Sequence, residues 1–331
     1  MASFFCSTRF LLLLLVLSAI PVAIIISLES ATPSSHYYQF HSTGWFRESS
    51  KWDEVKRRFI VSFTDGGGLG VVHVPDDHNP NDNVVLEEIP VVKNTDAVGN
   101  GTCGLFIDRP RNRVVVAIAD VFGNTYSAVA AYDMDSWKRL FFTQLSSSAD
   151  GKSFADDVAV DAEGNAYVTD AKGTQIWKVG VDGELLSVIR SPLFHAKEWY
   201  KDIVTLNGIA YHPNGYLLVS HTMTGNLFRV EIKNNNKVTV VKVDGSLSIA
   251  DGMELLAGGT KLVVAGANGV KLVESKDDWA TASVIGRSPV LKHRIATAAL
   301  VKDGKVYINH ALGMGYPNKK HVLLQATFSS S

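Results

Sequence analysis

Short apolar segments alternate with polar turns along most of the chain. The clearest example begins at Leu206, where the apolar segments Gly208–Tyr211, Tyr216–Ser220 and Asn226–Glu231 follow one another. The turn His212–Gly215 joins the first two, and its Pro and Gly supply the fixed and the positive φ angles that a tight reversal needs. Leu, Val, Ile and Tyr are common in these segments, as they are in packed strands. The pattern predicts a three-stranded meander.

The same arrangement recurs about every 45 to 55 residues. The copies are Lys51–Val74, Gly104–Asp133, Asp157–Gly183, Leu206–Val230, Asp251–Glu274 and Ala296–Gly313. A period of this length with three or four strands per unit indicates a β-propeller, because radial stacking buries sheet faces that no unit can bury alone. We predict an all-β, six-bladed β-propeller over residues 47–331, with a pair of β-sandwiches as the alternative. Val322–Phe328 reads as an extra strand that packs in the last blade or closes the ring with the first.

The N-terminus has the pattern of a targeting segment. Arg9 precedes an apolar run, Phe10–Leu28, whose length lies between a signal-peptide core and a membrane-spanning helix. We predict that residues 1–30 are a signal peptide or a signal anchor, and that residues 31–46 are a linker. The folded domain then enters the secretory pathway and is extracellular, vacuolar or luminal, with membrane attachment only through a retained N-terminal segment. The sequon at Asn100 fits this compartment, and a plain turn is its alternative reading.

The composition of the chain limits the kinds of partner that we expect. The 331 residues include 46% hydrophobic and 20% charged residues, as in an ordinary globular protein, with a net charge of -1. No basic block stands out, so we expect no nucleic-acid partner. Cys6 lies in the leader, which leaves Cys103 as a buried apolar residue without a disulfide partner. We expect a monomer that acts on a small molecule.

The candidate chemistry emerges when one position is compared across the copies. The residue before each first strand is Glu48, Cys103, Asp156, Asn207, Asp251 and, in the sixth copy, about Ala296. Equivalent positions of a propeller form a ring at one end of its channel, so the three carboxylates and the amide would converge there. Such a group repels itself unless a cation lies between its members, and hard oxygen ligands favour Ca²⁺ or another divalent cation. The alternative is that these residues simply cap loops.

These residues also carry a family resemblance. Glu48 four residues before Trp52, the sequence Asn207-Gly208-Ile209 and the sequence Asp251-Gly252-Met253 resemble the senescence marker protein/gluconolactonase (regucalcin-like) family of six-bladed propellers. This family is related to calcium-dependent phosphotriesterases, paraoxonases and strictosidine synthase. The resemblance implies that Glu48, Asn207 and Asp251 bind one divalent cation in the central channel. Asp156 stands where the related enzymes have Asn, and Glu48-Ser49-Ser50 departs from the family's Glu-Gly-Pro.

A central cation would polarise a lactone carbonyl or a phosphoryl oxygen. The resemblance implies that Asp251 is the base or nucleophile beside it. His221 and His310 end the second strands of their copies, and we predict that both rim the pocket as general acids or bases; hydrogen-bonded structural roles are the alternative. We predict a secreted or luminal metal-dependent hydrolase of a lactone, ester or phosphoester. The alternative is a non-enzymatic propeller that binds a ligand or a protein and holds a structural metal.

Overall fold

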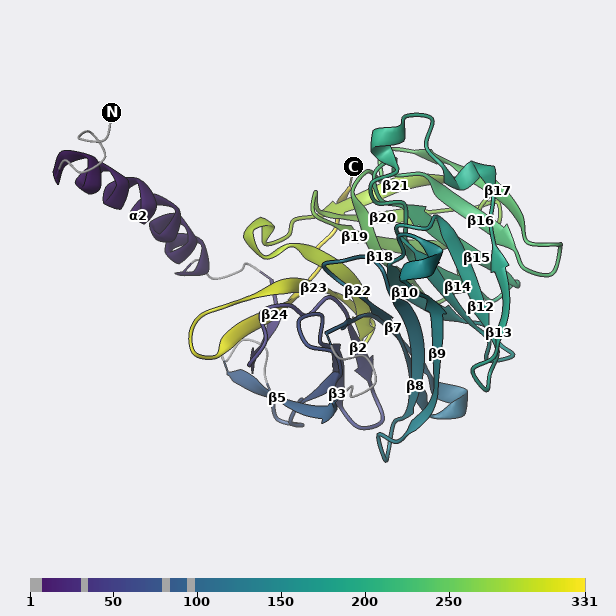
Figure 1. Cartoon of the computed structure of the whole chain (residues 1–331), viewed down its shortest axis with the longest axis horizontal. Helices are drawn as coiled ribbons and strands as arrows, with labels where there is room; N and C mark the ends of the chain where they lie inside the picture. The colour runs from purple at the N-terminus through teal and green to yellow at the C-terminus, as the bar shows by residue number, and fades with distance from the viewer. Residues whose placement is uncertain (1–7, 31–34, 79–83, 94–98, 331) are drawn as a thin grey trace. The chain divides into compact units, whose positions relative to one another are not determined.

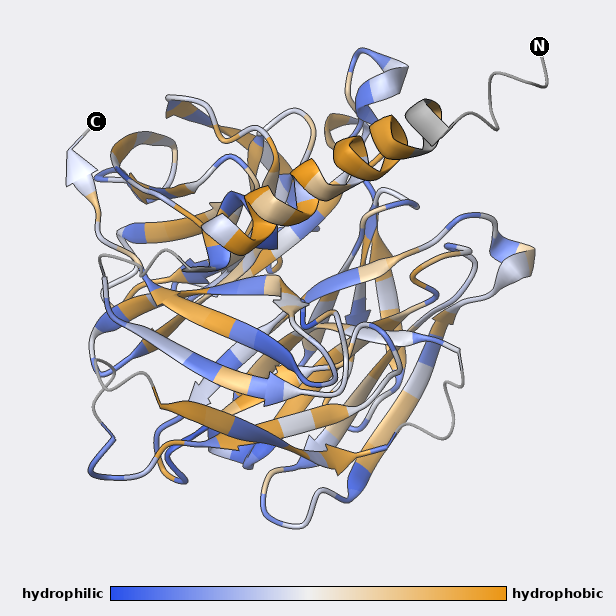
Figure 2. Cartoon of the chain, turned by 90° about the vertical axis from the view of Figure 1, so that its left-hand side faces the viewer, coloured by the Kyte–Doolittle hydropathy of each residue, from blue (hydrophilic) through white to orange (hydrophobic). Residues whose placement is uncertain are grey.

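The computed structural model describes residues 8–30, 35–78, 84–93 and 99–330. It divides into two units, Met1–Ser34 and Ser35–Ser331, which are described separately. The first contains the helix α2 (Thr8–Ser30), in which the apolar residues are not confined to one face (Figure 2). Within the described part of the chain, its segment Leu12–Glu29 is the one helix long and apolar enough to cross a membrane. A signal peptide and a membrane anchor are both compatible with this helix.

The second unit consists of six blades of four main strands each, arranged around a central axis as the repeats predicted (Figure 1). Neighbouring blades are joined at two places, so that the strands form two four-stranded sheets, one eight-stranded sheet and one nine-stranded sheet. Blade 1 contains β2 (Ser50–Asp53), β3 (Arg58–Ser62), β4 (Leu69–His73) and β5 (Val85–Val92). Blade 2 contains β6 (Gly101–Asp108), β7 (Arg113–Ala119), β8 (Ser127–Asp133) and β9 (Arg139–Ser146). Blade 3 contains β10 (Ala155–Val160), β11 (Ala166–Asp170), β12 (Gln175–Val179) and β13 (Leu185–Ile189).

The other three blades follow the same order. Blade 4 contains β14 (Leu206–His212), β15 (Tyr216–His221), β16 (Leu227–Glu231) and β17 (Lys237–Asp244). Blade 5 contains β18 (Ala250–Leu255), β19 (Lys261–Gly266), β20 (Val270–Glu274) and β21 (Thr281–Ser288), with the short β25 (Ser329–Ser330) paired to β21. Blade 6 contains β22 (Ala296–Lys302), β23 (Lys305–Met314), β24 (Lys319–Gln325) and β1 (Tyr37–Ser42).

The last blade is completed by a strand from the other end of the domain. β1 pairs antiparallel with β24 along its whole length, from Tyr37 opposite Leu324 to Ser42 opposite Lys319. It also pairs in parallel with β5 of blade 1, which joins the first and last blades. The sequence predicted a linker over residues 31–46, but its part from Tyr37 to Ser42 is this closing strand. The strand expected near the C-terminus is β24, and it packs in the last blade as predicted.

The core lies between neighbouring blades. In β7, the side chains of Val114, Val116 and Ile118 pack in a cluster shared with blade 1. The alternate residues Val115 and Ala117 pack in a cluster shared with blade 3. Successive side chains of a strand point to opposite faces, so a strand with both faces covered is apolar throughout. Such packing fixes the inner strands around the axis, and these strands carry the site.

Candidate metal centre

A β-bulge interrupts the inner strand in five of the blades, always near its first residues. The register shifts between Thr102 and Leu105 in β6, and equivalent shifts occur in β10, β14, β18 and β22. The bulges contain Cys103, Asp156, Asn207, Asp251 and Thr297, while Glu48 precedes the inner strand of blade 1. A bulge adds a residue to one strand and redirects its side chain, here toward the axis. The sequence placed the sixth position at about Ala296, but the residue inside the bulge is Thr297.

Glycine follows the bulged residue where neighbouring blades meet most closely. A Cβ atom at Gly208 would lie 2.4 Å from the backbone oxygen of Asp251. A Cβ atom at Gly252 would lie 2.8 Å from the backbone oxygen of Thr297. Backbone atoms cannot approach a side chain this closely, so glycine is required there. The Asn-Gly and Asp-Gly pairs of the sequence thus reflect contact between adjacent bulges.

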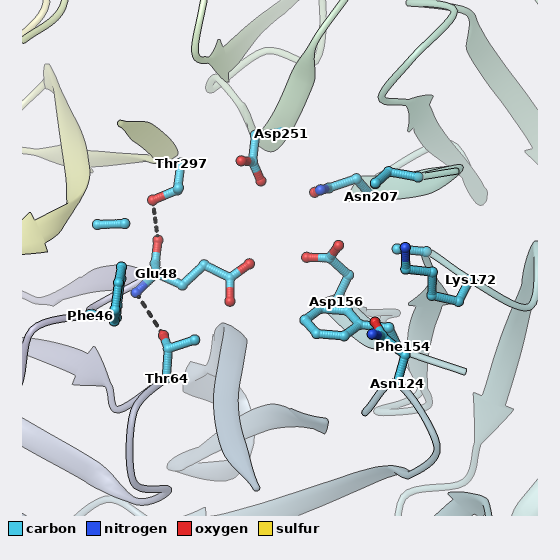
Figure 3. Close-up of a pocket in the computed structure, with 13 residues that line it drawn as sticks. Phe46, Glu48, Thr64, Asn124, Phe154, Asp156, Lys172, Asn207, Asp251 and Thr297 are labelled. Atoms are coloured by element: carbon cyan, nitrogen blue, oxygen red, sulfur yellow. Dashed lines mark hydrogen bonds between the residues drawn. The ribbon is translucent and has the colours of Figure 1, made fainter. Parts of the chain in front are cut away.

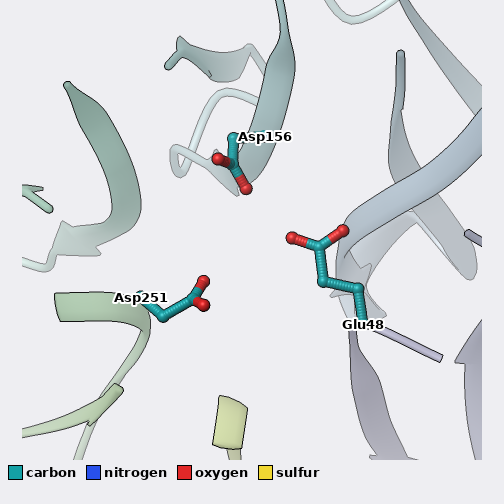
Figure 4. A group of neighbouring side chains, drawn as sticks. All are labelled: Glu48, Asp156 and Asp251. Carbon is teal, nitrogen blue, oxygen red and sulfur yellow. The ribbon is translucent and has the colours of Figure 1, made fainter. Parts of the chain in front are cut away.

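Three carboxylates from alternate blades meet at one end of the channel (Figure 4). Glu48, Asp156 and Asp251 each offer an oxygen atom, and these atoms lie within 4.8 Å of one another. The side chain of Asn207 points toward them from blade 4 (Figure 3). The structure therefore brings together all four residues that the sequence singled out as oxygen ligands.

The electrostatics of this cluster require a positive partner. Burial and repulsion by Asp251 raise the pKa of Glu48 to about 8. Burial and nearby carboxylates also raise the pKa values of Asp156 and Asp251 well above their usual range. Carboxylates kept from water and close to one another are stable only when protonated or when bound to a cation. Cations and protons therefore compete for this site.

Two buried oxygen atoms of the cluster have no hydrogen-bond partner. They are Oε2 of Glu48 and Oδ1 of Asn207. A buried polar atom without a partner is costly, which makes such atoms candidate ligands for a metal ion. A set of carboxylate and amide oxygens is the donor set of hard divalent cations such as Ca²⁺ or Mg²⁺. The residues therefore fit a divalent cation.

The backbone of Glu48 is fixed by the junction of blades 1 and 6. Its N–H donates to Oγ1 of Thr64 at 3.1 Å, and its carbonyl oxygen accepts hydrogen bonds from Thr297 at 2.5 Å and from Nδ2 of Asn309 at 2.8 Å. The preceding Arg47 is buried and donates to Glu88 at 2.7 Å and to Asp65 at 2.8 Å. These bonds hold Glu48 in place although it lies outside a regular strand.

Sequence reasoning missed the residues that support the ring from the second strands. Asn309 in β23 donates to the backbone oxygens of Arg47 and Glu48. Thr169 in β11 donates to the backbone oxygen of Asn207 at 2.7 Å. Ser62 has the equivalent place in β3 and accepts from the backbone N–H of Ser49. The sequence does contain a signal for these supporting residues. A small polar residue stands near the end of the second strand, and in three of the blades it directly precedes an aspartate or a histidine.

The histidines predicted at the rim lie elsewhere. Neither His221 nor His310 is among the described residues that line the cavity above the carboxylates. His310 is fully buried, its Nε2 accepts from the backbone N–H of Leu291 at 3.1 Å, and burial lowers its pKa to about 4. His221 is also buried, and its Nε2 lies 3.6 Å from Oδ1 of Asp202. The prediction for the two histidines was wrong by one residue, because the side chain that precedes each histidine in its strand is the one that faces the ring.

His221 instead has a place in a turn. Asp120 directly follows the second strand of blade 2, and Asp170 ends the second strand of blade 3. Their carboxylates accept from backbone N–H groups of the next few residues. His221 ends the second strand of blade 4, and its Nδ1 accepts from the backbone N–H of Thr224 at 3.4 Å. Asp and His side chains at this position stabilise the turn to the third strand, as short polar side chains commonly do.

A cavity of about 330 Å³ opens above the carboxylates (Figure 3). Its described lining includes the four predicted ligands together with Thr64, Asn124, Lys172 and Thr297. Its apolar lining consists of Phe46, Phe154, Ala171, Val204 and Ala311. Val204 belongs to the long connection between β13 and β14. The volume is in the usual range for small-molecule sites.

Comparisons with known proteins support the fold. No protein-family model matches the chain, and no curated protein sequence matches it. Among solved structures, the major allergen Mala s 1 of Malassezia sympodialis aligns with a TM-score of 0.66 at 17% identity, covering 90% of this chain and 97% of that one. A candidate gluconolactonase aligns with a TM-score of 0.53 at 14% identity, covering 90% and 94%. A streptogramin B lyase aligns with a TM-score of 0.52 at 10% identity, covering 89% and 98%.

These alignments and the site define the class of the protein. It is a six-bladed β-propeller in which carboxylate side chains from alternate blades converge at one end of the axis. The resemblance to gluconolactonase-like propellers that the sequence indicated is confirmed at the level of the fold. At sequence identities of 10% to 17%, these structural matches show the fold and do not show a substrate or an activity.

Proposed function

We propose that the protein is a metal-dependent hydrolase that cleaves a lactone, an ester or a phosphoester above the axial carboxylates. The observation that carries this proposal is the convergence of Glu48, Asp156 and Asp251 with oxygens within 4.8 Å, at the floor of a cavity of about 330 Å³. A purely structural cluster would not need a cavity above it. A divalent cation bound there, with Ca²⁺ as our choice, would supply Lewis-acid stabilisation of the negative oxygen that develops during hydrolysis.

The chain's own residues have defined tasks in this proposal. Glu48, Asp156, Asn207 and Asp251 would hold the ion, and Asp251 would also accept the proton of the attacking water. The amide of Asn207 lies beside Asp251 and favours the charged form of its carboxylate, because it lowers the pKa of Asp251. Thr297 and Asn309 act through Glu48, whose backbone they fix. No proton-transfer role falls to His221 or His310, which are buried away from the cavity lining.

The proposal is tested by metal binding and turnover together. Calorimetry with Ca²⁺ on the metal-free protein should detect one site, and a panel of lactones, aryl esters and phosphotriesters should be hydrolysed with Ca²⁺ but not with chelator. Asp251→Asn removes a charge from the site, so it should weaken Ca²⁺ binding by roughly two orders of magnitude and abolish turnover. The matched control, Asp182→Asn at an exposed turn, should change neither.

A bound ion without turnover on any substrate would contradict the enzyme. That result would favour the alternative, a ligand-binding propeller in which the metal is structural. An absence of Ca²⁺ binding at pH 8 would contradict both the hydrolase and the ligand-binding propeller with a structural metal.

We propose in addition that residues 1–30 direct the propeller into the secretory pathway. The apolar helix Leu12–Glu29 and the sequon at Asn100 support this location. Expression in a eukaryotic secretory system, followed by glycosidase treatment, should lower the apparent mass of the protein, and Asn100→Gln should abolish that shift. Retention in the cytosol would contradict the proposal.

A further inference from the structure

The wall of the axial cavity is mainly apolar. Five of its described lining residues carry no side-chain hydrogen-bonding group, namely Phe46, Phe154, Ala171, Val204 and Ala311. The polar groups of the site are concentrated on its floor, where the carboxylates and Asn207 face the ion position (Figure 3). A ligand that reaches the floor with a carbonyl group must therefore place the rest of its atoms against carbon.

The polar side chains of the wall already make hydrogen bonds inside the chain. Thr297 donates to the backbone oxygen of Glu48 and accepts from Asn309 at 3.1 Å. The ammonium group of Lys172 donates to the backbone oxygen of Ile203 at 2.7 Å. Oγ1 of Thr64 accepts from the backbone N–H of Glu48, and Nδ2 of Asn124 donates to the backbone oxygen of Phe122 at 3.3 Å. A ligand hydroxyl at Thr297 would have to compete with the bonds of that side chain, and a buried hydroxyl without a partner is costly.

Exposed apolar side chains are concentrated in the loops at the same end of the propeller. Those on connections at the end where the inner strands begin include Trp45, Phe46, Phe122, Trp199, Ile295 and Tyr316. Phe122, Trp199 and Tyr316 are more than 80% exposed, at 86%, 82% and 90%. Among the described residues, only two exposed large apolar side chains lie on loops at the opposite end of the propeller, namely those of Val55 and Val84. A ligand approaching the cavity thus meets an apolar surface, which is a common mark of a binding site.

We propose that the substrate is an uncharged lactone or ester with an aliphatic or aromatic substituent, and that polyhydroxylated sugar lactones are poor substrates. This inference rests on the proposed function. Water adds its oxygen to the acyl carbon, the acyl carbon–oxygen bond breaks, and the leaving oxygen takes a proton. A lactone thus gives a hydroxy acid, an ester gives an acid and an alcohol, and no redox partner is needed. Phe46, Phe154 and Val204 contact the substituent, and Val204 is the wall residue whose side chain can be changed in polarity with little change in shape.

The first experiment compares two δ-lactones that differ in their substituents. In the presence of Ca²⁺, kcat/KM for δ-decalactone should exceed that for δ-gluconolactone by at least about 100-fold, the discrimination that a hydrophobic pocket gives against one added hydroxyl. The corresponding δ-lactams, which resist hydrolysis, are then titrated calorimetrically, and the alkyl lactam should bind more tightly by a similar factor.

The variants Val204→Thr and Val240→Thr test the assignment of the wall. Both exchange a methyl group for a hydroxyl in a similar shape, but Val204 lines the cavity and Val240 lies on the outer strand β17. Val204→Thr should reduce the preference for the alkyl compound about tenfold in turnover or lactam binding, while Val240→Thr leaves it unchanged. Thermal unfolding verifies that both variants fold.

The outcomes separate this inference from the proposed function. A preference for the alkyl lactam without turnover of either lactone supports an apolar specificity of the cavity but contradicts the hydrolase, and with it the identification of a substrate. Turnover that favours δ-gluconolactone supports the hydrolase and overturns the inference. Failure of both lactams to bind overturns the inference as well.

Discussion

At the scale of single residues, one step along a strand decides whether a side chain faces the axial ring or points away from it. Asn309 and His310 are neighbours in β23, and both are buried. Asn309 supports Glu48 across the junction of the first and last blades, whereas His310 bonds to the backbone of Leu291. Successive residues of a strand point to opposite faces, so a periodicity-based prediction that is wrong by one residue selects the opposite environment.

The variant Asn309→Ala should weaken both the fold and the metal site. It leaves the backbone oxygens of Arg47 and Glu48 without their Nδ2 donor, which should lower the free energy of unfolding by about 2 kcal/mol in urea titrations. The loosened Glu48 should reduce Ca²⁺ affinity about tenfold, in the range of supporting-residue effects. Ser220→Ala is the control, because its bond to Gly208 is long at 3.4 Å. Equal effects of the two variants would contradict a specific role for Asn309.

At the scale of elements, the bulges of the inner strands decide the spacing at the axis. Replacing Gly208 by Ala would drive a Cβ atom against the backbone of Asp251. We expect Gly208→Ala to lower the free energy of unfolding by about 1–3 kcal/mol, as overpacking does, and to weaken Ca²⁺ binding through the displaced Asp251. Gly66→Ala is the matched control, since a Cβ atom there has open space. A Gly208→Ala protein with unchanged stability and Ca²⁺ affinity would contradict the close approach of the bulges.

The strand β1 closes the ring and protects the edge of the last blade. β1 covers the outer edge of β24 and buries Phe40 and Tyr38 in a cluster with Phe59 of blade 1. A chain that begins at Ser35 should therefore unfold cooperatively, while one that begins at Thr43 should lose much of its stability or aggregate, because the last blade then exposes an unpaired edge. Thermal unfolding and size-exclusion chromatography measure both. Equal stability of the two chains would show that β1 is dispensable.

At the scale of the whole molecule, blade closure forces carboxylates from distant parts of the chain into one small volume. Burial and repulsion by Asp251 raise the pKa of Glu48 from 4.5 to about 8. The folded, metal-free protein then keeps a proton that the unfolded chain releases, so the free energy of unfolding should fall as the pH rises from about 4.5 to about 8. Saturating Ca²⁺ displaces the proton and should remove this fall.

Thermal unfolding with Ca²⁺ or with chelator measures this linkage. The stabilisation by Ca²⁺ should be small at pH 5 and should grow up to about pH 8, because binding at low pH must release protons. Asp251→Asn should flatten the profile of the metal-free protein, since it removes a negative charge that raises the pKa of Glu48. A Ca²⁺ effect that is the same at pH 5 and pH 8 would contradict the assignment.

The sequence by itself determined the repeat, the number of blades and the four oxygen donors. Strand length, turn chemistry and the Asn-Gly and Asp-Gly pairs are local features, so each repeat records them in its own residues. Only the tertiary structure decided that β1 closes the ring, that Thr297 is the sixth axial residue and that Asn309 rather than His310 supports Glu48. Each of these depends on pairing or bulge register between segments far apart in the chain, and such register leaves no trace in local periodicity.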